Sequence, residues 1–157
     1  MKKRLFIIAI SSIVLVGCRT TQKATSYREF EVECLGVALD GSQTVRAWGF
    51  GKDTGAAVDK ARKNALNAVL FKGITAGVAG CNQRPLVSEV NARERYEDYF
   101  DSFFQDGGAW ESFVSGADER LFGREEQRNN LGERAGVVVR VLRNELRIKL
   151  KEDGILK

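Results

Sequence analysis

The chain has 157 residues, with 25 Lys and Arg, 21 Asp and Glu, and no histidine. The absence of histidine excludes Ser-His-Asp and Cys-His nucleophile arrangements and metal sites with histidine ligands. Carboxylates are plentiful, but nothing in the sequence fixes the distance between any two of them, so solvated faces explain them better than a glycosidase pair. We therefore predict a protein that is not an enzyme and has no catalytic residue, metal site or cofactor.

The N-terminus has the layout of a signal peptide. Three positive charges, at residues 2–4, precede an apolar stretch of 12 residues, Leu5–Val16. A membrane-spanning helix needs about 20 apolar residues, so the stretch is too short for a permanent span. It runs into the sequence Leu-Val-Gly-Cys at residues 15–18, which resembles the lipobox of bacterial lipoproteins. The resemblance implies cleavage before Cys18 and its modification by acyl chains such as palmitate; the alternative is an ordinary signal peptide in which Cys18 is incidental.

Removal of residues 1–17 changes the charge and sets the expected location. It takes three of the 25 basic residues and none of the acidic ones, which leaves a net charge of +1 and no support for nucleic-acid binding. The residue after Cys18 is Arg19, which resembles the pattern of lipoproteins directed to the outer membrane. We expect a membrane partner through the lipid on Cys18, and a location in the cell envelope facing the periplasm.

The remaining chain divides into a tether and one domain. Residues 18–28 are polar and predict a lipidated tether, and residues 29–157 are enough for a single core of ordinary size. Once Cys18 is acylated, Cys34 and Cys81 remain as a pair in a compartment where disulfides persist. A disulfide between them and a small buried residue at Cys34 both fit the pattern.

The N-terminal half of the domain predicts a hairpin and a helix. Alternating apolar residues, the turn sequence Asp40-Gly41 and a return strand indicate a β-hairpin over residues 29–50. Asp53 or Thr54 can cap a helix that continues to Gly73. Its apolar side is mostly alanine, which lets a helix lie close to a sheet. The sequence Gly-Phe-Gly at residues 49–51 is interpreted as a structural turn, with a phosphate-binding loop as the alternative.

An aromatic-rich insert at residues 81–113 follows an irregular segment. Asn91 and Glu94 have the spacing of a capping pair, and aromatic residues from Tyr96 to Phe104 recur at helical spacing, which predicts one helix ending near residues 107–108. These aromatics either cover the sheet as core or stay partly exposed as anchors of a protein interface. The candidate interface residues are Tyr96, Tyr99, Trp110 and Phe113.

The C-terminal part predicts a second hairpin and a final element. Residues 136–141 are apolar and β-branched, which indicates a strand whose partner lies around residues 120–127. For residues 142–154, helical spacing that ends in Gly154 is favoured over a strand. The fold class is therefore α+β, with two layers: a short antiparallel sheet of about four strands covered by two or three helices.

This arrangement resembles that of a known group of proteins. A strand ending at residues 47–51, an alanine-rich helix and a valine-rich strand leading into the final helix are similar to small bacterial outer-membrane lipoproteins and to the N-terminal domain of the flagellar T-ring protein FlgT. The resemblance implies a structural or assembly component with an envelope protein, or itself, as partner. The alternative is a module that binds a small ligand or cell-wall glycan through its aromatics.

Overall fold

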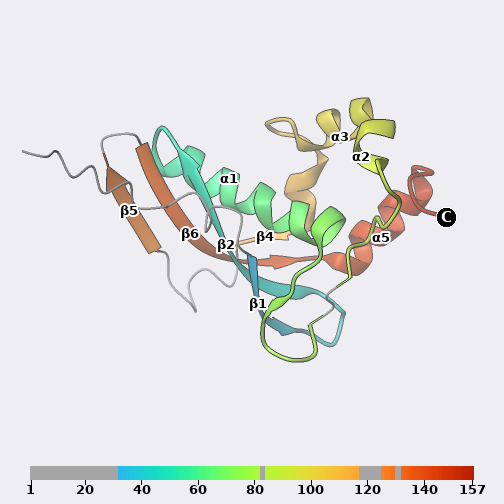
Figure 1. Ribbon diagram of the computed structural model, residues 1–157, viewed down its shortest axis with the longest axis horizontal. Coiled ribbons are helices and arrows are strands. Elements are labelled where there is room, and N and C mark those ends of the chain that lie inside the picture. The colour runs from blue at the N-terminus through green and yellow to red at the C-terminus, as the bar shows by residue number, and fades with distance from the viewer. Residues whose placement is uncertain (1–31, 82–83, 117–124, 130–131) are drawn as a thin grey trace, which may run out of the picture.

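The computed structural model describes residues 32–81, 84–116, 125–129 and 132–157 (Figure 1). In this part of the chain six strands form one sheet, in the order β3-β1-β2-β6-β4, and β5 pairs with β6 along the same edge as β4. The strands are β1 Val32–Val37, β2 Gln43–Gly51, β3 Ala76–Gly77, β4 Val114–Ser115, β5 Glu125–Asn129 and β6 Gly132–Val141. The helices are α1 Thr54–Asn67, η2 Ala68–Lys72, α2 Ala92–Arg95, α3 Glu97–Phe104, η3 Ala109–Phe113 and α5 Arg143–Glu152.

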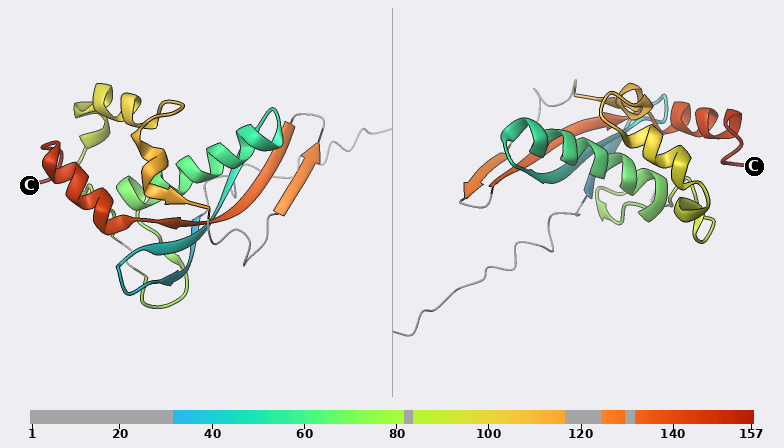
Figure 2. Two further views of the ribbon diagram at one scale, coloured as in Figure 1. Left: turned by 180° about the vertical axis from the view of Figure 1, so that it is seen from behind. Right: turned by 90° about the horizontal axis from the view of Figure 1, so that it is seen from above.

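The predicted α+β class is confirmed. Figures 1 and 2 show α1 lying along one face of the sheet, with α2 and α3 on the same side and α5 beyond the end of β6. The sheet is mixed and not purely antiparallel, because the two-residue strand β3 pairs in parallel with β1. The core lies between α1 and the sheet and is lined by valines of β6, among them Val137, Val139 and Val141.

The first hairpin is confirmed over its described residues, while residues 29–31 lie outside them. Its turn contains Gly41 at a φ of 81°, a conformation that favours glycine. The Asp40 carboxylate accepts bonds from the backbone N–H and the hydroxyl of Ser42, at 2.8 and 2.7 Å. The Asn144 side chain then donates to the Asp40 carbonyl at 2.7 Å, which ties the turn to the first turn of α5.

The predicted alanine-rich helix is confirmed as α1 and its π-helical continuation η2. Asp53 is the N-cap, and its carboxylate accepts the Ala56 N–H at 2.8 Å. The helix ends at Gly73, which has a φ of 79°. Because the buried positions of α1 are mainly alanine, the helix axis comes close enough to touch the backbone of β2 at Gly49 and Gly51.

The predicted aromatic helix is two helices in the structure. α2 and α3 are separated at Tyr96, whose backbone is not helical (φ −114°, ψ 36°). The capping pair is wrong, because Asn91 is left-handed (φ 59°) and its side chain makes no capping bond. Within α3, Phe100 and Phe103 are both buried. The helix also ends at Phe104, before the predicted glycines.

The C-terminal predictions are confirmed with shifted boundaries. β5 and β6 form the second hairpin, but β5 begins at Glu125, and residues 120–124 of its predicted range lie outside the described part. β6 begins at Gly132, four residues before its predicted start. The tail is helical, so the strand alternative is wrong: Gly154 has a φ of 73° and the Ile155 N–H bonds the Leu150 carbonyl at 2.8 Å.

Candidate functional site

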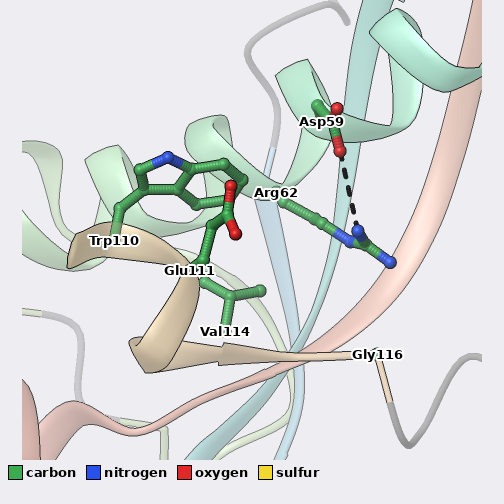
Figure 3. Close-up of a pocket in the computed structure, with 6 residues that line it drawn as sticks. All are labelled: Asp59, Arg62, Trp110, Glu111, Val114 and Gly116. Carbon is green, nitrogen blue, oxygen red and sulfur yellow. Dashed lines mark ion pairs between the residues drawn. The ribbon is translucent and has the colours of Figure 1, made fainter. Parts of the chain in front are cut away.

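A small cavity of about 310 Å³ opens between α1 and the segment formed by η3 and β4 (Figure 3). This volume is at the lower end of the range of ligand pockets. In Figure 3 the Asp59 and Arg62 side chains come from α1, and their ion pair measures 3.6 Å. The full set of lining residues is Asp59, Arg62, Trp110, Glu111, Val114 and Gly116.

The polar side chains in and next to this cavity mostly bond to other residues of the protein. One carboxylate oxygen of Glu111 accepts the Gly107 N–H at 3.1 Å. The ammonium of Lys63, beside the cavity, stands 5.2 Å from the Trp110 ring centroid and 2.8 Å from the Asp106 carboxylate, and this hydrogen bond lowers the pKa of Asp106. We therefore interpret the cavity as a gap where α1 packs against η3, and not as a ligand-binding pocket.

The predicted interface anchor Trp110 belongs to the core. It is 3% exposed, its indole N–H donates to the Gln105 carbonyl at 2.9 Å, and Lys63 covers the ring. The prediction that Trp110 stays partly exposed is wrong, because the 3₁₀ turn of η3 directs the indole inward against α1. A buried indole cannot serve as a stacking platform for a ligand.

The other three candidates are half-buried and pack against the core. Tyr99 lies 5.1 Å from Phe100 and 6.1 Å from Phe103 between ring centroids, and Phe113 stacks on Phe103 at 6.0 Å. The Tyr99 hydroxyl donates to the Asp153 carboxylate at 2.7 Å. Burial, followed by this bond, raises the pKa of Tyr99. Tyr96, the third of these candidates, shares the same packing, so the cluster mainly joins α3 and α5 to the core.

The structure joins Cys34 and Cys81 by a disulfide, with a Cα–Cα distance of 6.3 Å and a sequence separation of 47. The bridge links β1 to the loop that follows β3. Gly77 makes this approach possible: it pairs with Cys34, and a Cβ at Gly77 would stand 2.0 Å from the Cys34 carbonyl oxygen. Cys18, the predicted lipidation site, lies outside the described residues.

A second tie to the same loop comes from Arg143, at the start of α5. The side chain is 3% exposed and donates to the Arg84 carbonyl at 2.8 Å. Burial, and then the charge of Arg147, lower the pKa of the Arg143 guanidinium. This cation is enclosed by the fold: its Nη2 atom links the loop to α5, while its Nε and Nη1 atoms are buried without a hydrogen-bond partner.

The predicted turn at the Gly-Phe-Gly sequence is wrong, because these residues form the end of strand β2 and the bend before α1 comes at residues 52–53. A Cβ at Gly49 would stand 2.3 Å from the Ala57 carbonyl oxygen, and one at Gly51 would stand 2.5 Å from the Ala57 N–H nitrogen. The Asp53 carboxylate already caps the helix. Close packing of helix and strand therefore explains both glycines, and the carboxylate disfavours an anion at this end of α1.

A group of polar and aromatic side chains lies on the face of the sheet opposite α1. All of them except Phe50 are half-buried, and Val138, which is paired with Arg46 on this face, is 1% exposed. We call this group the open face and define it by the outward residues of β1, β2 and β6: Glu33, Thr44, Arg46, Trp48, Phe50, Arg134 and Arg140. Along β2 these residues alternate with buried ones such as Val45 and Ala47, which face α1. Sequence reasoning missed this cluster, although aromatic residues on the polar face of a strand were the available signal.

Among the described residues, no group of three or more Cys, Asp or Glu side chains could hold a metal ion. None of the described helices combines the length and hydropathy that crossing a bilayer requires. No protein-family model, curated protein or solved structure matches the chain. The resemblance to the FlgT N-terminal domain therefore stays a prediction.

Proposed function

We propose that the chain is an envelope lipoprotein, anchored through Cys18 to the periplasmic side of the outer membrane, that acts as a structural or assembly component. The observation that carries the proposal is the disulfide between Cys34 and Cys81. The sequence contains three cysteines, so this bridge leaves Cys18, at the end of the apolar stretch, as the remaining thiol. Disulfides persist in oxidising compartments, which agrees with export.

Two exposed apolar side chains at the tip of the first hairpin support binding to a partner protein. We call Leu39 and Val37 together the apolar knob. Leu39 is fully exposed at the tip of the β1–β2 hairpin, and Val37 beside it is 46% exposed. The hydrogen bond from Asn144 to the Asp40 carbonyl holds the tip in place. An exposed apolar side chain on a fixed turn loses little entropy when it enters a pocket, which favours binding. We propose that this knob contacts the envelope partner or a second copy of the chain.

The experiment is recovery of the tagged, anchored protein from detergent extracts after crosslinking in cells. We expect a stoichiometric envelope protein or a crosslinked dimer, and Leu39→Asp should reduce its recovery at least tenfold. Val90→Asp is the matched control, because Val90 is also strongly exposed but lies in the segment before α2. Recovery of the unmodified protein alone would contradict the assembly function. Equal recovery with Leu39→Asp would contradict the knob.

The second candidate function, binding of a cell-wall glycan, has different support. The structure removes Trp110 as a stacking platform, but the open face carries Trp48 and Phe50 together with arginines. This alternative uses the opposite face of the sheet from the aromatic cluster, so the two candidate functions can be tested with separate variants.

A further inference from the structure

The outer edge of strand β5 has no neighbouring strand in the described part of the chain. The five residues of β5 pair with β6 in antiparallel register, from Glu125 with Gly136 to Asn129 with Gly132. No other described strand pairs with β5, and Figures 1 and 2 show it at the margin of the sheet, far from α2, α3 and α5. Such an edge offers backbone N–H and C=O groups to a further strand.

The order of charges along β5 favours one kind of added strand. Its sequence is Glu-Glu-Gln-Arg-Asn. When a second copy of β5 is added in antiparallel direction and all five residues overlap, Gln127 is paired with itself across a two-fold axis. Glu126 is then paired with Arg128 of the second copy, and symmetry repeats this pair. Opposite charges that face each other across two strands stabilise their pairing.

Neighbouring registers do not have this complementarity. Because hydrogen bonding alternates along an antiparallel strand, two copies can shift against each other only in steps of two residues. A shift in one direction pairs Glu126 with its own copy, and a shift in the other direction pairs Arg128 with its own copy. Like charges that face each other are destabilising. The sequence of β5 therefore selects the same register that pairs all five residues.

We propose that β5 pairs with β5 of a second copy of the chain and joins the two sheets across a two-fold axis. Five residues extend over about 17 Å, which is a small contact, so the dimer should be weak and reversible. This inference rests on the proposed assembly function and deepens it by naming one partner. It does not use the apolar knob, because β5 pairs with the start of β6 and the first hairpin reaches its end at Val141.

The test is disulfide crosslinking of the full chain, purified in neutral detergent, with one cysteine added at each position of β5 in turn. Cysteines form a disulfide when their Cα atoms are about 4.4–6.8 Å apart. We expect Gln127→Cys to form at least about tenfold more covalent dimer than Glu125→Cys or Asn129→Cys, whose copies would be about 14 Å apart along the strands. A mixture of the last two variants should crosslink, and the unmodified protein gives the background.

Exchange of charges tests the register. In the Gln127→Cys background, Glu126→Arg and Arg128→Glu should each lower the yield of dimer about tenfold at low salt, because each pairs like charges. The double variant should restore the yield, because its opposite charges have only changed places. Glu152→Arg, the same change of charge at an exposed position of α5, is the matched control and should leave the yield unchanged.

Several results would overturn the proposal. These are a yield at Gln127→Cys no higher than the background, equal yields at all five positions, or a double variant that dimerises as weakly as the single variants. Crosslinking of Gln127→Cys in cells to a different protein, without a dimer, would assign the edge to that protein instead. If Gln127→Cys does not fold, sedimentation of the charge variants decides, and equal dimerisation by all of them counts against the edge.

Failure of this inference can be distinguished from failure of the assembly function. A partner whose recovery depends on Leu39, together with no dimer through β5, would keep the assembly function and remove the edge pairing. Crosslinking of the purified protein also does not depend on its location in the cell.

Discussion

Gly49 on β2 and Ala57 on α1 are in direct backbone contact: a Cβ at Gly49 would stand 2.3 Å from the Ala57 carbonyl oxygen. The same position would be 2.3 Å from the Ala61 nitrogen. Neither neighbour is a flexible side chain, so a larger residue has to move the helix as a whole. This contact sets the separation of α1 from the sheet.

We predict that Gly49→Ala lowers the free energy of unfolding by about 1–3 kcal/mol, because overpacking forces α1 away from β2. Urea denaturation monitored by circular dichroism measures the change. Gly36→Ala is the control, since a Cβ at Gly36 meets nothing within 4 Å. A loss equal to that of the control would contradict the close packing described for α1.

The disulfide should make a large contribution to stability. It closes a loop between residues separated by 47 positions, and in the chain-entropy model its removal costs about 4 kcal/mol. We expect the Cys34→Ala, Cys81→Ala double variant to unfold at lower urea concentration, and reductant to have the same effect on the unmodified protein. Insensitivity of the unmodified protein to reductant would mean that the bridge contributes little.

The aromatic cluster should behave as core. Because Trp110 is 3% exposed, we predict that Trp110→Ala lowers the free energy of unfolding by about 3–5 kcal/mol. Partner recovery should fall only in proportion to the loss of folded protein. Selective loss of a partner by a fully folded Trp110→Ala variant would restore the interface interpretation.

Asp153 should contribute to a loss of stability in acid. Its carboxylate accepts bonds from Lys149 at 2.6 Å and from Tyr99 at 2.7 Å, and these bonds, Lys149 first, lower its pKa below the ordinary value of 3.8. The stabilisation is fully present above the unfolded-state pKa and is lost as the pH falls through the lower folded-state pKa. We therefore expect the free energy of unfolding to fall from about pH 4 downward.

Urea denaturation at a series of pH values measures this dependence. Asp153→Asn should flatten the acid limb of the curve, whereas Glu152→Gln, at an exposed neighbouring position, should leave it unchanged. An acid limb that is as steep in Asp153→Asn as in the unmodified protein would show that another group is responsible.

The sequence predicts those elements whose local signals agree with their packing. The hairpin turn at Asp40-Gly41, the alanine-rich helix and the cap at Gly154 all depend on residues within a few positions of one another. The break at Tyr96 has no comparable local signal, because continuous helical spacing of the aromatics conceals it. It reflects packing of Phe100 and Phe103 on a core formed by distant residues.

The candidate site was harder to predict for a similar reason. The aromatic residues of the insert led to the prediction that Trp110 is an interface anchor. Its burial depends on α1, almost fifty residues earlier in the chain. The close contact of the Trp48 indole with Gly136 depends on the register between β2 and β6. Register between strands so far apart in sequence cannot be obtained from local spacing.

Mass spectrometry of the intact protein extracted from envelopes tests the central claim most directly. We predict a polypeptide that begins at Cys18, with a mass increased by a diacylglyceryl group and an amide-linked acyl chain, and with Cys34 and Cys81 oxidised. A chain that keeps residues 1–17, or that begins at Cys18 without acyl groups, would contradict the assignment of an anchored envelope protein.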